Sequence, residues 1–419
     1  MKWNLIQARS RFLGLVLLLV LSFLRPFPAL ADTSFAYVTH IYATHVSVID
    51  VETSQVITTV PVGLYAFEVV ISRDGKRVYV ASASGTVTVI NTASHSVIAT
   101  VTLGQSNYVN PGPIAVSPDG GRIYVADLTA DIITVIDTNT FNTLDVFQTG
   151  DAPNDIEVSP DGTRLYVANR FSESVSVFDT STNGVVANVT VGIWPYSLAV
   201  SPDGGRVYVA NQNSNNVSVI DTSTNSVVAT VHDRKASAPW GITVTPDGSR
   251  VYVSNLMTNS MTVIDTASNT QVPAPGLGYF SVIRPGGIAA TPDGNFVYVT
   301  SVYNKNLTVI DTRTNSVAGI IPLATRAMSV AIGLRTEVLI EDLQAALATL
   351  GLTTGLESAL LASIGAAADS LERGNTTSAA NQIEAFINKA EAQTGKGLTQ
   401  AQAENLIVLA EGVIEGFLE

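Results

Sequence analysis

The sequence predicts an all-β propeller of seven blades followed by a small all-α domain. A Tyr-Val pair recurs seven times at intervals of 42 to 46 residues, a period typical of propellers and solenoids. The surrounding segments are rich in Val, Ile, Thr and Tyr, with Asp-Gly and Asn turn signals between them, which indicates antiparallel strands. The composition then changes to Ala, Leu, Glu and Gln with a helical period. The repeated tyrosines are Tyr37, Tyr79, Tyr124, Tyr166, Tyr208, Tyr252 and Tyr298.

Each repeat contains four predicted strands, and the copy over 197–231 shows them most clearly. Its Ser-Pro-Asp-Gly segment suits a type I turn, because Pro202 presets φ and Gly204 takes the left-handed position. Four antiparallel strands in about 42 residues make one propeller blade. The predicted strands of this copy are 197–201, 206–211, 216–221 and 226–231.

The ends of the repeat predict how the ring closes. The first copy, at Tyr37, lacks its leading strand, and an unaccompanied leading strand follows the last copy at 328–332. One C-terminal strand and three N-terminal strands would complete the seventh blade and leave no open edge. We therefore predict a composite blade with three-plus-one closure.

The chain begins with the pattern of a signal peptide. Lys2, Arg9 and Arg11 precede an apolar run over 12–24, and Ala-Leu-Ala at 29–31 supplies a cleavage pattern. Thirteen apolar residues are too few for a membrane-spanning helix, which needs roughly 20. We expect a leader over 1–31 and no transmembrane segment in the mature chain, the alternative being a retained N-terminal anchor.

The C-terminal segment 334–419 has apolar residues at helical spacing, interrupted by glycines. Four stripes predict four helices, and Thr399 is placed to cap the last of them. The expected domains are therefore a leader at 1–31, a propeller at 32–333 and a helical domain at 334–419.

Two segments resemble known families. The unit Val207-Tyr208-Val209-Ala210-Asn211 followed by Val-Ser-Val-Ile-Asp-Thr at 217–222 resembles the YVTN-family β-propeller repeat. The segment Ala-Phe-Ile-Asn-Lys at 385–389, with Gly395-Lys396 and Leu398-Thr399, is similar to the FIMAH domain, a helical module of extracellular bacterial proteins. These resemblances imply a secreted or cell-surface setting, periplasmic if the cell has an outer membrane, and no defined chemistry.

Charge and cysteine content exclude several classes of partner and site. The leader carries four basic and no acidic residues, so its removal lowers the formal net charge from −13 to −17. Such a protein repels phosphate backbones, and we expect no nucleic-acid partner and no docking on anionic lipid. The chain has no cysteine, which excludes disulfides and thiolate chemistry.

Histidines and carboxylates do not predict a catalytic or metal site. His40 and His45 bracket one loop and would supply two ligands where a metal needs three or four, the alternative being solvated loop residues. Most aspartates belong to the repeat, as in the turn at Asp203 or at the strand end at Asp221, where a carboxylate accepts backbone N–H bonds. No ring of carboxylates is expected near the propeller axis, and no Ser-His-Asp set can be assigned. We therefore predict no catalytic residue, no metal and no cofactor.

Connection lengths predict which face of the propeller is functional. Three crossovers between blades, after Val101, Val231 and Pro275, are longer than the others, whereas the connections at the opposite face are constant. Loops that vary on a rigid scaffold commonly carry function. Residues before each leading strand should surround the channel mouth on this face. The predicted ligand-binding residues are Tyr65, Phe67, Asn110, Asn154, Trp194, Tyr196, Trp240, Arg284 and Arg326.

The mouth residues combine aromatic rings with arginines in an acidic protein, a set that suits sugars, peptides or carboxylates. The alternative is that Trp194 and Trp240 only fill gaps between blades. The sequence favours a secreted, non-enzymatic propeller that binds an extracellular glycan, peptide or protein surface, with the helical domain mediating surface association. Two other hypotheses are an exported enzyme of lactonase or redox type and a structural spacer of the cell surface.

Overall fold

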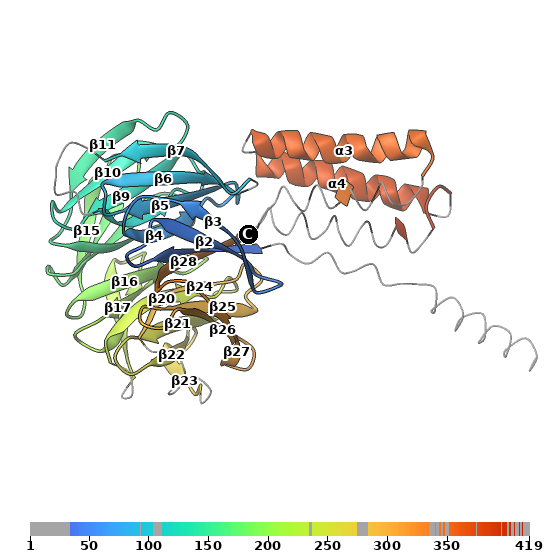
Figure 1. The fold of residues 1–419 in the computed structure, drawn as a ribbon. Helices are drawn as coiled ribbons and strands as arrows, with labels where there is room; N and C mark the ends of the chain where they lie inside the picture. Colours follow the sequence, from blue (N-terminus) through green and yellow to red (C-terminus); the bar gives the residue numbers. More distant parts are fainter. Residues whose placement is uncertain are drawn as a thin grey trace, which may run out of the picture.

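The computed structural model describes residues 34–92, 94–103, 111–233, 237–274, 284–334, 352–373, 375–394 and 396–399 and scattered positions in the C-terminal segment. Within the propeller ranges, 28 strands form seven four-stranded antiparallel sheets (Figure 1). The predicted seven-bladed propeller is therefore confirmed. The expected leader at 1–31 lies outside the described residues.

The first strand of each sheet packs against the first strands of the neighbouring sheets and so forms the inner ring. These inner strands are β4 (Ala66–Ile71), β8 (Pro111–Val116), β12 (Pro153–Val158), β16 (Pro195–Val200), β20 (Pro239–Val244), β24 (Pro285–Ala290) and β28 (Ala327–Leu334). The second strands are β5 (Arg77–Ser82), β9 (Arg122–Asp127), β13 (Arg164–Asn169), β17 (Arg206–Asn211), β21 (Arg250–Asn255), β25 (Phe296–Ser301) and β1 (Ser34–His40).

The remaining strands build the outer half of each blade. The third strands are β6 (Thr86–Asn91), β10 (Ile132–Asp137), β14 (Ser174–Asp179), β18 (Asn216–Asp221), β22 (Ser260–Asp265), β26 (Asn306–Asp311) and β2 (His45–Asp50). The outermost strands are β7 (Ser96–Thr102), β11 (Thr143–Gln148), β15 (Gly184–Thr190), β19 (Ser226–His232), β23 (Thr270–Val272), β27 (Ser316–Pro322) and β3 (Gln55–Pro61). We number the blades from 1, the sheet with β1, to 7, the sheet with β24.

Blade 1 is the composite blade, and it closes the ring as predicted. Its strand order is β28-β1-β2-β3, and β28 pairs antiparallel with β1, Phe35 opposite Gly333 and Tyr37 opposite Ala331. β28 also packs against β24 on one side and β4 on the other. The C-terminal strand therefore joins the two ends of the propeller into one ring.

Side chains of the repeated strands fill the spaces between blades. Tyr208 packs with Val251 and Val253 of the next blade, whereas Val207 and Val209 pack with residues of the preceding blade. All seven repeated tyrosines are at most 2% exposed. Successive strand residues point to opposite faces of the sheet. Because a neighbouring blade covers each face, residues on both faces are apolar.

The repeated polar residues bond within the turns at the face opposite the crossovers. Ser201 donates to Asp203 at 2.5 Å, and Gly204 has a φ of +70°, as the type I turn with a left-handed glycine requires. Asp221 accepts the backbone N–H of Thr224 at 3.1 Å and forms an ion pair with Arg206. These contacts confirm that the repeat aspartates have a structural role.

Thr222 links two turns of one blade by donating to the carbonyl of Gly204 at 2.7 Å. Thr222→Val removes this donor and leaves the carbonyl unpaired, so we expect a loss of about 1–2 kcal/mol and a melting temperature lower by roughly 2–6 °C. Thermal unfolding followed by circular dichroism measures the change. Thr224→Val, at an exposed position of the same turn, is the control and should change stability much less.

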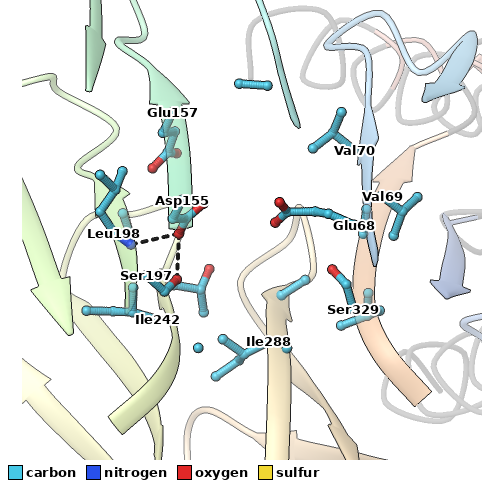
Figure 2. Close-up of a pocket in the computed structure, with 18 of the residues that line it drawn as sticks. Glu68, Val69, Val70, Asp155, Glu157, Ser197, Leu198, Ile242, Ile288 and Ser329 are labelled. Carbon is cyan, nitrogen blue, oxygen red and sulfur yellow. Dashed lines mark hydrogen bonds between the residues drawn. The ribbon is translucent and has the colours of Figure 1, made fainter. Parts of the chain in front are cut away.

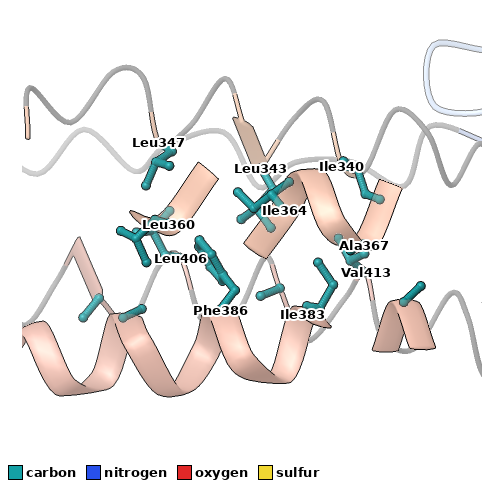
Figure 3. Packing of buried hydrophobic residues seen from close by; sticks show 14 of the residues in the cluster. Ile340, Leu343, Leu347, Leu360, Ile364, Ala367, Ile383, Phe386, Leu406 and Val413 are labelled. Atoms are coloured by element: carbon teal, nitrogen blue, oxygen red, sulfur yellow. The ribbon is translucent and has the colours of Figure 1, made fainter. Parts of the chain in front are cut away.

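The C-terminal segment contains two continuous described helices, α3 (Thr354–Glu372) and α4 (Thr376–Gln393). They pack against each other around Leu360, Ile364 and Phe386 (Figure 3). The first and fourth predicted helices are described only at isolated positions, which are helical and mostly buried. Those buried in the same cluster are Ile340, Leu343, Leu347, Ala403, Leu406, Ala410 and Val413.

Thr399 forms the cap that the sequence predicts. Its hydroxyl lies 3.3 Å from the backbone N–H of Gln402, and the Gln402 side chain accepts the Thr399 N–H at 2.9 Å. This reciprocal arrangement is a capping box, which stabilises the first turn of a helix. Among the described helices, none is long and apolar enough to cross a membrane.

Candidate functional site

The inner strands surround a central cavity of about 490 Å³, within the range of small-molecule sites (Figure 2). Its wall combines apolar side chains, such as Val69, Ile114 and Leu198, with polar and acidic groups. All seven blades contribute to this wall through their inner strands, blade 3 through Ile114, Ala115 and Val116 of β8. The cavity is thus a product of ring closure.

The residue before five of the inner strands has a left-handed backbone. The φ angle is +57° at Trp194 and +57° at Arg284, and the same conformation occurs at Tyr65, Ala152 and Ala238. Non-glycine residues rarely adopt this region, so neighbouring contacts must hold it. The carbonyl of Trp194 accepts the N–H of Gln212 at 2.8 Å, and that of Arg284 accepts the N–H of Val302 at 3.0 Å. The crossover and the loop between the second and third strands are thereby joined.

The left-handed residue separates the predicted mouth residues into two groups. In a regular strand, residues i and i+2 point to the same side of the sheet. The prediction therefore placed Trp194 and Tyr196 together at the channel mouth. Instead, Trp194 is 36% exposed on the crossover face, whereas Tyr196 lines the cavity. Tyr65, Arg284 and Arg326 are likewise exposed on the crossover side. Phe67, Asn154, Tyr196 and Trp240 line the cavity, and Asn110 lies outside the described residues.

Trp240 and Trp194 have different surroundings. Trp240 lies against Tyr196 of the preceding blade, with 4.1 Å between ring centroids. It therefore fills space between blades and also forms part of the cavity wall. Trp194 instead lies under the guanidinium of Arg170, 4.5 Å from its ring, and 6.3 Å from the ring of Phe171. The gap-filling alternative thus describes Trp240 in part and does not describe Trp194.

Two further groups of side chains lie on the crossover face. One places two arginines beside a tyrosine ring, and the other is a pair of tyrosine rings. The guanidinium carbons of Arg284 and Arg326 lie 5.9 and 5.0 Å from the ring centre of Tyr303. Tyr42 and Tyr65 meet edge to face at 5.4 Å. Arg170, Phe171, Tyr303 and Tyr42 were missed because the sequence argument followed the crossovers and not the loops between second and third strands. The position of these loops beside the crossovers was the available signal.

Three carboxylates face the cavity, although no ring of carboxylates was expected near the axis. Glu68 extends from β4 toward Asp155 and Glu157 on β12 (Figure 2). Asp155 accepts hydrogen bonds from the Ser197 hydroxyl at 2.7 Å and the Leu198 N–H at 2.8 Å in the next blade. The sequence argument overlooked these three because it followed the acidic residues of the repeated turns, whereas these three occupy inner strands.

Glu68 and Glu157 also reach the neighbouring blade. Glu68 accepts the N–H of Ile114 at 3.3 Å, and Glu157 accepts the N–H of Val200 at 2.7 Å. Each of these two bonds uses one carboxylate oxygen. No other hydrogen bond to either carboxylate is present within the described part of the chain. One oxygen of each therefore remains for contacts in the cavity.

Burial raises the pKa of all three carboxyl groups. It raises the pKa of Glu157 to about 8, with a smaller contribution from the charge of Asp155 and an opposing one from the Val200 N–H. Burial and the charge of Asp155 hold the pKa of Glu68 well above its usual range. Burial also raises the pKa of Asp155, against the hydrogen bonds from Ser197 and Leu198. The cavity therefore gains negative charge as the pH rises.

The histidines do not form a metal site in the described structure. His40 is fully buried, so the expectation of a solvated loop residue is wrong for it. Its Nε2 lies 2.7 Å from the Ser47 hydroxyl, the same contact that Asn169 makes with Ser176 in blade 4, because both residues end the second strand of their repeat. Burial lowers the pKa of His40 to about 4. Over the described ranges, no three His, Asp or Glu side chains converge as metal ligands.

The three enlarged crossovers lie largely outside the described residues, which omit 104–110, 234–236 and 275–283. Their described flanks border the crossover face, for example where Ala238 precedes β20. The prediction that these loops contribute to a site stays a prediction.

Three family models match separate parts of the chain. Residues 137–240 match the seven-bladed lactonase propeller, residues 22–111 the YNCE-like propeller and residues 338–415 the FIMAH domain. No curated protein matches the sequence. The two propeller matches fall mainly on the sheet-forming part of the chain, and the FIMAH match falls on the C-terminal segment that contains α3 and α4.

Solved structures with a similar fold include hydrazine synthase of Kuenenia stuttgartiensis. It is 23% identical with a TM-score of 0.58, over 64% of this chain and 89% of that one. A functionally unknown protein of Desulfotomaculum acetoxidans DSM 771 is 18% identical with a TM-score of 0.60, over 72% of this chain and 98% of that one. Likeness at these identities shows the fold alone.

Proposed function

The chain is a seven-bladed β-propeller of the lactonase and YNCE-like, YVTN type with a C-terminal FIMAH domain, and we propose that it is a non-enzymatic binding protein. Its ligand is an extracellular glycan, peptide or protein surface held at the crossover face over the channel. The observation that carries this proposal is the set of exposed aromatic rings and arginines on that face.

The groups on the crossover face suit recognition for physical reasons. Arg170 lies over Trp194, and Arg284 and Arg326 lie over Tyr303, so planar cations and rings alternate on one surface. Exposed aromatic rings bind sugar and peptide surfaces, and guanidinium groups bind carboxylates. Large apolar side chains exposed beside functional loops commonly mark interaction sites. Examples on this face are Ile193, at 41% exposure, and Met257, at 62%.

The setting of the protein forms part of the same proposal. The leader pattern at 1–31 directs the chain out of the cytoplasm, to the surface, the medium or a periplasm. The C-terminal segment is a four-helix module that associates with the cell surface. Nucleic acid is not a partner, because the mature chain is strongly acidic. Deleting residues 334–419 and measuring oligomeric state and cell-wall retention tests the role of the tail, and loss of retention alone would favour a structural spacer.

Lactone hydrolysis is a second candidate function, favoured by the lactonase match over 137–240 and by the cavity carboxylates. A carboxyl group with a raised pKa, such as that of Glu157, would suit general acid or base catalysis near neutral pH. Assays with a panel of aliphatic and sugar lactones test this candidate. Elemental analysis and an absorbance spectrum of the purified protein test the redox alternative.

Substitutions on the crossover face test the binding proposal. We expect Trp194→Ala or Arg284→Ala to weaken any ligand found by glycan and peptide screening by about tenfold or more, because anchors of this kind carry most of the binding energy. Leu144→Ala, at an exposed residue of an outermost strand, is the control and should bind normally. The site assignment fails if alanine at all of Trp194, Tyr196, Trp240, Arg284 and Arg326 leaves binding unchanged.

A further inference from the structure

The cavity beneath the crossover face has one sign of charge. Its lining contains Glu68, Asp155 and Glu157 and no lysine, arginine or histidine. Buried charges in proteins are normally paired or neutralised, because an isolated ion is costly to remove from water. The described cavity wall supplies backbone and hydroxyl donors to these groups but no positive charge. A cation from outside the chain would complete this site.

The carboxylates are arranged around a shared space. Glu68 extends from one side of the cavity toward Asp155 and Glu157 on the other side (Figure 2). Glu68 and Glu157 use one oxygen each to accept an N–H of the neighbouring blade, Ile114 at 3.3 Å and Val200 at 2.7 Å. These bonds fix the direction of the two side chains. Their remaining oxygens would accept donors from a molecule in the cavity.

Aromatic residues lie between the carboxylates and the crossover face. Tyr196 and Trp240 stand near the starts of β16 and β20, with 4.1 Å between ring centroids. Asp155 is two residues into β12, and Glu157 is two residues further along. At about 3.3 Å per strand residue, Glu157 lies roughly 6–7 Å deeper than Asp155. A ligand entering from the crossover face meets aromatic rings first and carboxylates beyond them, an order that favours an organic cation.

We propose that the cavity binds an organic ammonium or guanidinium group, which enters from the crossover face and is held by the negative charge of Glu68, Asp155 and Glu157. This inference rests on the proposed binding function and names the chemistry that the channel recognises. A cavity of about 490 Å³ accommodates such a group with the chain that carries it. A metal ion is disfavoured, because no three acidic or histidine side chains converge as ligands among the described residues. The group belongs either to a small free amine or to a basic side chain of a peptide.

Calorimetric titration of the full mature protein with simple probes tests the proposal. Cadaverine and the peptide acetyl-Gly-Lys-Gly-amide should bind at pH 8.5, whereas their neutral counterparts, 1-pentanol and acetyl-Gly-Gln-Gly-amide, should not. Glu68→Gln combined with Glu157→Gln should weaken ammonium binding by about tenfold or more, because each change keeps an acceptor for the neighbouring blade and removes the charge. Glu173→Gln, an exposed acid on the crossover face, should bind like the wild type.

The pH dependence gives a second readout. The titratable groups that line the cavity are Glu68, Asp155, Glu157 and Tyr196, and ammonium affinity should rise between pH 6 and 9 as the carboxyl groups lose their protons. Tyr196 stays protonated in this range, because burial raises its pKa. The double variant should lose most of this pH dependence. Circular dichroism confirms that each variant is folded before titration.

The outcomes separate this inference from the proposed function. Tighter binding of the lysine peptide, weakened by Trp194→Ala, identifies a peptide side chain, and tighter binding of cadaverine identifies a free amine. Absence of ammonium binding, equal binding by the double variant, or carboxylate-dependent binding of Ca²⁺ in place of amines would overturn the inference. A crossover-face ligand that binds without any ammonium effect leaves the proposed function standing. Ammonium binding without any effect of crossover-face substitutions leaves only the cavity inference standing.

Discussion

Glu157→Gln is expected to raise the melting temperature at pH 9 by about 5–10 °C and to leave it almost unchanged at pH 4. The reason is that burial raises the pKa of Glu157 to about 8 in the folded chain, against an ordinary value of 4.5. The folded state therefore binds a proton more tightly than the unfolded state. Its stability is largest below about pH 4.5 and falls as the pH rises to about 8. Glutamine stays neutral and avoids this loss.

The size of the effect follows from the same difference in pKa. One pKa unit corresponds to about 1.4 kcal/mol, and partial access of water to the cavity reduces the full value, so we expect about 2–4 kcal/mol at pH 9. Thermal unfolding of wild type and variant from pH 4 to pH 9 measures it. Glu173→Gln is the control for a change in net charge at an exposed site. A gain of equal size at pH 4 and pH 9 would show that removal of charge is not its cause.

Removal of β28 is expected to lower the melting temperature by roughly 10 °C or more, or to make the chain insoluble. A chain ending at Arg326 keeps the other six inner strands but leaves the inner edge of β1 open, because the pairs of Phe35 with Gly333 and of Tyr37 with Ala331 are lost. Ala327 and Val330 also leave the apolar cluster that contains Tyr298. A chain ending at Leu334 keeps the strand and lacks the helical domain, so it is the matched control.

Circular dichroism melts and size-exclusion chromatography compare the two truncated chains. A synthetic peptide with the sequence of residues 327–334 should partly restore the shorter chain, because a free strand can pair with an open sheet edge. Equal melting temperatures of the two chains would mean that β28 contributes little to ring closure. A low melting temperature of both chains would instead assign the stabilisation to the segment after Leu334.

The blades and their closure were predictable because they depend on residues that recur. Tyr208, Asp203 and Thr222 meet the same neighbours in each copy of the repeat, so a pattern seen several times specifies one local geometry. Thr399 was predictable for a different reason, since a capping box needs only residues three positions apart. In these cases the information lies within one blade or one helical turn.

The cavity carboxylates were not predicted, because their role depends on contacts between blades. Glu68 and Asp155 share one repeat position, to judge from their pairing opposite Ala81 and Ala168. At the corresponding position, blade 5 has Ser197, opposite Ala210. Acidic residues at a position that elsewhere holds small side chains were a usable signal. The sequence argument compared copies to find what they share, and here the differences carried the information.

The division of the mouth residues needed the backbone conformation. The sequence around Trp194 contains no signal for a left-handed φ, because tryptophan seldom adopts a positive φ without tertiary contacts. The hydrogen bond from Gln212 to the Trp194 carbonyl supplies that constraint from a loop 18 residues away. Side-chain direction at the mouth was therefore beyond a prediction based on strand alternation.

The left-handed residue before the inner strands makes this propeller suitable as an engineering scaffold. Tyr65, Ala152, Trp194, Ala238 and Arg284 hold the same backbone angle with five side chains that range from a methyl group to an indole. A combinatorial library at the three exposed positions, Tyr65, Trp194 and Arg284, would redesign the crossover face while the channel wall two residues later keeps its composition. Such a library should omit Val, Ile and Thr, because branching at Cβ is poorly tolerated at positive φ. Variants with a new specificity at the crossover face and variants with new chemistry in the cavity could then be selected in separate rounds.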